Sequence, residues 1–178
     1  MKIVTLLTAV LTALPLAVRA QAHEHGAARL DVALEAGTLS LQFEAPLEAL
    51  FGFERAPRSA TERQLVDAGI ARLKVADRLF KLDAAARCSL KSVVLTSAAL
   101  RLGTAAGAPP DTADTTEHAD LDATIEFECK DAAKLGAIDV ALFEAFPRLQ
   151  RIDVQVATPK GQFKRGLKRP ANRISLLR

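Results

Sequence analysis

Residues 30–43, LDVALEAGTLSLQF, decide the fold of this chain. Apolar and polar residues alternate up to Leu34 and again from Leu39, and Ala36-Gly37 interrupts the alternation between them. A period of two residues on both sides of a glycine turn predicts a β-hairpin with one buried face. We therefore expect the folded part of the chain to open with two antiparallel strands.

One long helix is predicted after the hairpin. A short helical turn at residues 47–50 precedes it, and the sequence SATE then places Ser59 three residues before Glu62. This spacing is typical of a capping box, in which the two side chains satisfy backbone N–H groups at a helix start. The helix is expected to end near Leu79, and its predicted inward-facing residues are Leu65, Gly69, Leu73, Ala76 and Phe80.

The second half of the chain is predicted to be mostly extended, with strand patterns at 88–96, 121–129, 138–142, 152–156, 163–167 and 174–177. Residues 101–118, rich in Gly, Pro, Thr and Asp, are expected to form a flexible loop. The predicted fold class is α+β and β-rich, with antiparallel hairpins and sheets in two halves around one long helix. We expect residues 23–178 to form a single domain.

The first 22 residues have the pattern of a secretory signal peptide. Lys2 precedes an apolar run that ends in the A-x-A sequence Ala20-Gln21-Ala22. The run is short for a membrane-spanning helix and contains Pro15, so a cleaved signal is favoured over an anchor. Cleavage after residue 20 and cleavage after residue 22 both fit, and either predicts a periplasmic protein that is not integral to the membrane.

The charge balance gives no reason to expect binding to nucleic acid. Without Lys2 and Arg19, the 24 basic residues become 22, against 21 acidic ones. The segment 160–178 nevertheless contains no acid and seven cations, which are Lys160, Lys164, Arg165, Lys168, Arg169, Arg173 and Arg178. Such a segment is more typical of an edge strand that resists aggregation, although an anionic membrane surface would attract it as well.

Two cysteines, Cys88 and Cys129, are the only ones in the chain. An even count in an oxidising compartment predicts a structural disulfide between them. Two thiols alone do not make a structural zinc site, and the absence of C-x-x-C argues against a redox pair.

All three histidines lie just ahead of predicted strands, in the acidic sequences H-E-H and E-H-A-D. If those two strands are neighbours in the sheet and run the same way, the two segments meet at one end. Imidazoles and a carboxylate would then form a nitrogen and oxygen site of the kind that zinc or copper prefers. The candidate ligands are His23, His25 and His118 with Glu24, Glu117 or Asp120.

A second metal site would not depend on the fold. Cleavage after Ala20 or after Ala22 makes His23 or His25, respectively, the third residue of the mature chain. A free amine, two backbone amides and a third-residue imidazole can chelate Cu²⁺ or Ni²⁺ in square-planar geometry. Cyclisation of Gln21 would block this chelate, and solvated histidines without any metal are the plain alternative.

No sequence motif points to catalysis. The chain contains no G-x-S-x-G, no H-E-x-x-H and no glycine-rich phosphate loop. We therefore expect a protein that is not an enzyme, and the alternative to a metal-binding protein is a metal-free structural or protein-binding module of the cell envelope.

Six segments in order along the mature chain carry a family resemblance: HEHG at 23–26, PLEALFGFERAPR at 46–58, Cys88 with Cys129, HADL at 118–121, LFEAFP at 142–147 and TPKGQ at 158–162. With them the chain resembles the ZrgA-type family of zinc-regulated periplasmic proteins. The resemblance implies a periplasmic zinc-binding protein that serves zinc uptake and hands metal towards an inner-membrane transporter. Such proteins often carry a His-rich insertion between the cysteine-bearing strands and a histidine where this chain has Arg55, so a single site is expected here rather than a zinc store.

Overall fold

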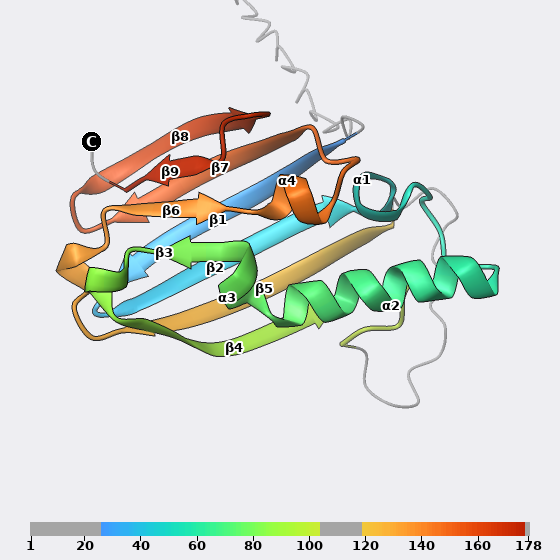
Figure 1. Ribbon diagram of the computed structural model, residues 1–178, viewed down its shortest axis with the longest axis horizontal. Coiled ribbons are helices and arrows are strands. Elements are labelled where there is room, and N and C mark those ends of the chain that lie inside the picture. Colours follow the sequence, from blue (N-terminus) through green and yellow to red (C-terminus); the bar gives the residue numbers. More distant parts are fainter. Residues whose placement is uncertain (1–25, 104–118, 177–178) are drawn as a thin grey trace, which may run out of the picture.

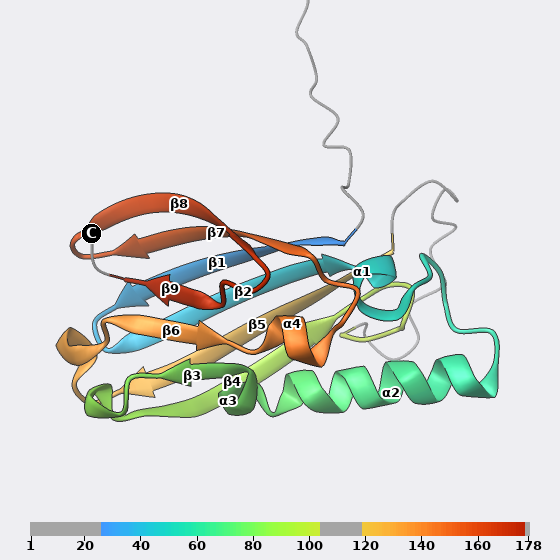
Figure 2. The ribbon, with the colours of Figure 1, turned by 45° about the horizontal axis from the view of Figure 1, so that its top comes forward.

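The computed structural model describes residues 26–103 and 119–176, which form two stacked layers (Figures 1 and 2). The first layer is a six-stranded sheet in the order β4-β5-β2-β1-β7-β8. Its strands are β1 (Ala27–Glu35), β2 (Thr38–Pro46), β4 (Cys88–Thr96), β5 (Asp120–Cys129), β7 (Arg151–Thr158) and β8 (Gly161–Lys168). This large sheet places β1, the first strand, beside β7, which follows more than a hundred residues later, because the two strands pair.

The strand directions decide which chain ends share an edge of the large sheet. The pair β1 and β7 is parallel, and the other four neighbouring pairs are antiparallel. Strands β1, β5 and β7 therefore start at the same edge, where β2, β4 and β8 end. We call this the leading edge and define it by Ala27, Asp120 and Arg151, the first residues of the three starting strands.

The second layer covers one face of the large sheet (Figure 2). It contains a three-stranded sheet in the order β3-β6-β9 and several short helices. The elements are α1 (Leu47–Phe51), α2 (Ala60–Lys74), α3 (Ala76–Leu79), β3 (Phe80–Leu82), η1 (Ala84–Ala86), η2 (Ala132–Lys134), β6 (Ala137–Val140), α4 (Leu142–Ala145) and β9 (Arg173–Ser175).

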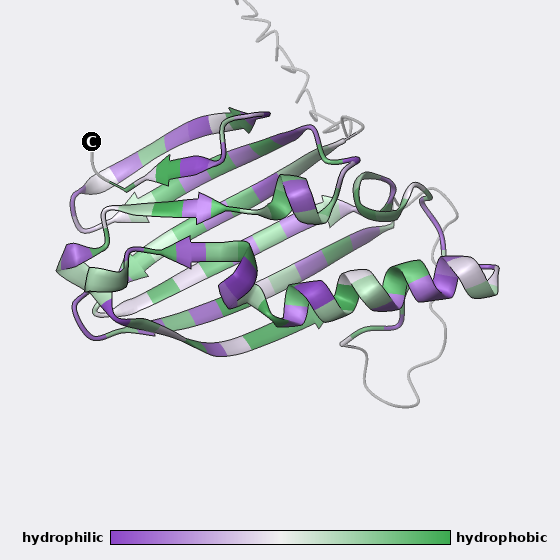
Figure 3. Ribbon diagram, in the orientation of Figure 1, coloured by the Kyte–Doolittle hydropathy of each residue, from purple (hydrophilic) through white to green (hydrophobic). Residues whose placement is uncertain are grey.

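The alternating sequence of the strands explains the two layers, and Figure 3 shows this alternation along the large sheet. Residues of one parity are buried against the second layer, among them Leu30, Leu41, Phe43 and Ile125. Residues of the other parity, such as Gln42, lie on the outer face. Burial of the apolar residues is the main driving force for stacking the layers.

The predicted hairpin is confirmed. Leu34 pairs with Leu39, and the two turn residues Ala36 and Gly37 have φ angles of 45° and 90°. Two successive residues at positive φ give the turn a twist that matches the strands, and glycine adopts this geometry at little cost.

The predicted disulfide is also confirmed. Cys88 and Cys129 are direct partners on the neighbouring strands β4 and β5 and are bonded to each other across 41 residues of sequence. A cross-link of this kind typically adds about 2–4 kcal/mol to the free energy of unfolding.

The predicted capping box of the long helix is confirmed, but its extent and inward face differ. The hydroxyl of Ser59 accepts a hydrogen bond from the Glu62 N–H at 3.1 Å. Helix α2 ends at Lys74, and α3 follows as a separate short helix. The prediction that Leu65 faces inward is wrong: its exposed fraction is 43%, and Val66 is buried in its place. The helix packs through Val66, Gly69 and Leu73. Leu65 precedes Val66 by one residue and is therefore rotated by about 100° around the helix axis, away from the packed face.

The expectation of two halves around one long helix is not confirmed. Helix α2 lies along one side of the second layer, and one end of it extends beyond the sheet (Figure 1). The observed architecture is instead β-rich, with two mainly antiparallel sheets, few helices and one disulfide.

Smaller differences concern strand ends and the predicted loop. Strand β6 ends at Val140 and Leu142 begins α4, so the strand predicted to reach residue 142 is shorter. The last predicted strand is β9, which ends at Ser175. Of the predicted flexible loop, residues 104–118 lie outside the described residues, and Leu102 forms a β-bridge with Ser97. Within the described parts of the chain, no helix has the length and apolar character needed to cross a membrane.

Candidate metal site at the leading edge

Only one of the predicted metal ligands, Asp120, belongs to the described residues, as the first residue of β5. His23, Glu24, His25, Glu117 and His118 lie outside them. What the structure describes is the position and direction of the two strands, β1 and β5, that directly follow the histidine segments.

The two histidine-containing segments lead into strands that start at the same edge. The segment ending in His25 leads into β1, and the segment containing His118 leads into β5. The assumption that these strands are neighbours is wrong, because β2 lies between them. Both are antiparallel to β2, so they do run the same way. Two strand spacings of about 4.8 Å place β1 and β5 roughly 10 Å apart.

Backbone and side-chain hydrogen bonds hold the start of β5 in place. The N–H of Leu47, which begins α1, donates to the carbonyl of Ala119 at 2.7 Å. The hydroxyl of the buried Ser97 donates to the carbonyl of Asp120 at 2.7 Å. The start of α1 and the residue that follows β4 therefore both fix where β5 begins.

The start of β1 is held equally closely. The carbonyl of Gly26 accepts hydrogen bonds from the N–H groups of Gln150 at 2.8 Å and Arg151 at 3.1 Å. Gly26 has a φ of 73°, and a Cβ at this position would lie 3.1 Å from the Arg148 carbonyl oxygen. Glycine directly after His25 lets the chain pass close to the segment that precedes β7.

A row of one polar and four charged side chains crosses the outer face of the large sheet one step inside the leading edge. The paired residues, from β4 to β7, are Thr96, Asp122, Glu44, Arg29 and Asp153. Partial desolvation and the carboxylates of Glu44 and Asp120 raise the pKa of Asp122, and a hydrogen bond with Thr96 opposes this shift. Desolvation is the larger cause of this shift, and the contributions of Glu44 and Asp120 show that three carboxyl groups lie near one another where β5 starts.

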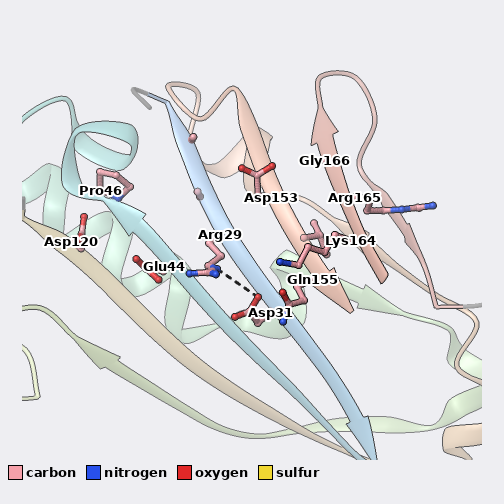
Figure 4. A pocket seen from close by; sticks show the side chains of 13 residues that line it. Arg29, Asp31, Glu44, Pro46, Asp120, Asp153, Gln155, Lys164, Arg165 and Gly166 are labelled. Atoms are coloured by element: carbon pink, nitrogen blue, oxygen red, sulfur yellow. Dashed lines mark ion pairs between the residues drawn. The ribbon is translucent and has the colours of Figure 1, made fainter. Parts of the chain in front are cut away.

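A hollow of about 770 Å³ lies on the same outer face, over β1, β2, β7 and β8 (Figure 4). Glu44 and Asp120 line it on one side, and Lys164 lies on the other. Between them, Arg29 Nε lies 3.8 Å from Asp31 Oδ1. The hollow is therefore acidic towards β2 and β5 and basic towards β8.

Sequence reasoning missed Glu44 and Asp122 as members of this acidic group. Both occupy polar positions of strand patterns, which is where solvated carboxylates normally lie. Their proximity follows from the pairing of β2 with β5, a contact between distant parts of the chain. In the described ranges 26–103 and 119–176, no three His, Cys, Asp or Glu side chains form a group that could hold a metal ion.

Comparison with known proteins identifies the family. No curated protein matches the chain. The sequence profile described as ZrgA family zinc uptake protein matches residues 22–176, which is nearly the whole chain after the predicted signal. The chain therefore belongs to the ZrgA family of zinc uptake proteins.

Proposed function

We propose that this protein is exported to the periplasm, binds one zinc ion at the leading edge and hands it towards an inner-membrane transporter. The proposed ligands are His23, His25 and His118, with Asp120 or Glu24 as a carboxylate ligand. One observation carries the proposal: the strands that directly follow the two histidine segments run the same way and start at the same edge.

The distances involved are compatible with one shared ion. Strands β1 and β5 lie roughly 10 Å apart, and each extended residue adds about 3.3 Å of chain. Zinc bonds imidazole nitrogens at about 2.0–2.1 Å and accepts four ligands from separate segments. Segments of two or three residues that approach from β1 and from β5 are therefore long enough to meet across the end of β2.

The charge at the leading edge supports the same conclusion. Asp120, Asp122 and Glu44 lie close enough for their carboxylates to influence one another. A divalent cation bound beside them by the histidines would relieve this repulsion. We propose binding rather than catalysis as the role of the site.

The test is a competitive titration with Zn²⁺ and Cu²⁺ of protein matured by its own export machinery. It compares the wild type with the triple variant His23→Ala, His25→Ala, His118→Ala and with His118→Ala alone. Zinc binding should be lost in both variants, and zinc at about 100 times its Kd should add about 2.7 kcal/mol to the free energy of unfolding of the wild type.

Two comparisons make the outcome specific. Asp120→Asn should weaken zinc binding, whereas Glu128→Gln, at the opposite end of β5, should not. Copper binding that survives His118→Ala would indicate the separate chelate at the mature N-terminus. Equal zinc binding by the wild type and the triple variant would contradict the proposal and favour a metal-free envelope module.

A further inference from the structure

Strand β8 and the turn before it carry exposed cations that form no ion pair with other described residues. Of the seven cations in residues 160–178, Arg169 donates hydrogen bonds to backbone carbonyls and Arg173 pairs with Asp139. Arg178 lies outside the described residues. Four exposed cations remain, which are Lys160, Lys164, Arg165 and Lys168. Among the described residues, no ion pair involves any of these four.

These four cations lie along one outer edge of the large sheet. Strand β8 is the last strand of the large sheet and pairs with β7 on one side only. Lys164 and Lys168 lie on the outer face, Arg165 lies on the other side over the Phe163 ring, and Lys160 lies in the hairpin turn. Eight strand residues at about 3.3 Å each make this edge roughly 26 Å long. We call it the β8 edge.

Within residues 26–103 and 119–176, no acidic side chain pairs with the cations of the β8 edge. Residues 160–178 contain neither Asp nor Glu. The one acid on β7 is Asp153, which faces Gly166, and its Oδ1 accepts hydrogen bonds from Arg151 at 2.9 and 2.7 Å. The cations of the β8 edge therefore project an uncompensated positive field into solvent.

We propose that the β8 edge docks the protein onto the headgroups of an anionic lipid bilayer. An extended anionic surface can contact cations on both sides of this edge and in its turn at the same time. Lysines on an edge strand disfavour the alternative, the addition of a partner strand. Rows of Lys and Arg are attracted to anionic bilayers roughly in proportion to their number, and the attraction weakens as salt increases.

The docking goes beyond the proposed function and does not rest on it. None of the proposed zinc ligands belongs to the β8 edge, so zinc binding and membrane docking can fail separately. Strand β8 ends at the leading edge, where Lys168 pairs with Arg151, and a docked protein would therefore hold that edge near the bilayer.

The test is co-sedimentation of the matured full-length chain with vesicles, in EDTA so that zinc cannot bridge protein and phosphate. One vesicle preparation contains equal parts of phosphatidylglycerol and phosphatidylcholine, and the other contains phosphatidylcholine alone. The wild type should bind only the anionic vesicles and should dissociate as salt is raised. The variant Lys164→Glu, Arg165→Glu, Lys168→Glu should bind at least about tenfold more weakly.

A matched control separates the β8 edge from net charge. The variant Lys74→Glu, Arg78→Glu, Lys81→Glu changes the net charge equally, at exposed positions of the second layer, and should keep its binding. Circular dichroism checks that both variants are folded. If the charge-reversal variant of the β8 edge is not folded, the milder variant Lys164→Ala, Lys168→Ala takes its place. The proposal is overturned by absent wild-type binding, by equal losses in both variants, or by soluble polyglutamate that binds the β8 edge more tightly than vesicles do.

Discussion

Glu62 joins the start of α2 to the segment that precedes it. Its carboxylate accepts hydrogen bonds from the Arg55 guanidinium at 2.8 and 2.9 Å and from the Arg58 N–H at 2.6 Å. The hydrogen bond from Arg55, followed by that from Arg58, lowers the pKa of Glu62 from 4.5 to about 2. Arg55 also lies over the Phe53 ring at 5.1 Å, so one ion pair orders the whole connection between α1 and α2.

The lowered pKa predicts how Glu62 contributes to stability as pH changes. The unfolded chain binds the proton more tightly than the folded protein, so ionised Glu62 stabilises the fold above about pH 4.5. This stabilisation should be lost as pH falls from 4.5 towards 2. We expect Glu62→Gln to lower the melting temperature at neutral pH and the difference from wild type to shrink in acid, as measured by circular dichroism.

Glu35→Gln, at an exposed position at the end of β1, is the control and should show no comparable trend. A difference between Glu62→Gln and the wild type that stays constant from neutral pH to pH 2 would contradict the assigned role.

At the scale of an element, α2 is held against the rest of the second layer by a close approach at Gly69. A Cβ at this position would overlap the Phe51 ring and would lie 3.5 Å from Phe146 Cε1. Phe51 and Phe146 are buried and contact each other edge to face, with ring centroids 6.5 Å apart. Glycine in the middle of α2 is therefore required by packing, despite its low helix propensity.

We predict that Gly69→Ala destabilises the protein. Overpacking costs about 1–3 kcal/mol, and the gain in helix propensity of up to about 1 kcal/mol offsets only part of it. Chemical denaturation followed by far-ultraviolet circular dichroism measures the change, because the chain has no Trp or Tyr for fluorescence.

Gly166→Ala is the matched control for this substitution. A Cβ there would meet only Asp153 Oδ1, at 3.7 Å, so we expect a change within about 0.5 kcal/mol. Equal stabilities of the two glycine variants would show that α2 does not pack as closely as described.

At the scale of the whole molecule, Arg169 links the large sheet to the second layer. It follows the last residue of β8, and its guanidinium donates hydrogen bonds to the carbonyls of Phe143, Pro147 and Leu149. It also lies over the Phe143 ring at 5.3 Å. These carbonyls belong to α4 and to the connection from α4 to β7, so one side chain bridges both layers.

Arg169→Met should retain the aliphatic part of the side chain and lose these hydrogen bonds. Carbonyls left without their donor typically cost about 1–3 kcal/mol, and we expect the free energy of unfolding to fall by this amount. Arg165→Met removes a guanidinium from the surface of β8 and should cost less than about 0.5 kcal/mol. If both variants unfold at the same denaturant concentration, Arg169 does not stabilise the contact between the layers.

Much of the local structure could be predicted because it depends on short-range patterns. Ala36-Gly37 marks the hairpin turn, and Ser59 with Glu62 marks the start of α2. The pairing of Cys88 with Cys129 follows from their being the only two cysteines. Leu65 was misplaced because only the packing partners of α2 determine which of two adjacent apolar residues faces inward.

The candidate metal site, too, could be predicted only in part from the sequence. The sequence indicated the histidines and the candidate Asp120 from their positions at the starts of strands, on the condition that β1 and β5 are neighbours and run the same way. Strand β2 lies between them, and it brings Glu44 next to Asp122 at the leading edge. No local pattern reports this contact, because residues 44 and 122 lie 78 positions apart in the sequence.

The sequence by itself determined most of the strands, the start of α2, the disulfide and the family. These follow from a period of two residues, from capping and turn residues, from the cysteine count and from short motifs, all of which act locally or by composition. Only the tertiary structure decided the strand order and the parallel pairing of β1 with β7. It also decided the place of α2 at one side of the second layer, and which side of the outer face is acidic and which is basic. The physical reason is that many strand orders bury the same alternating residues, and the choice among them depends on how all the side chains pack together.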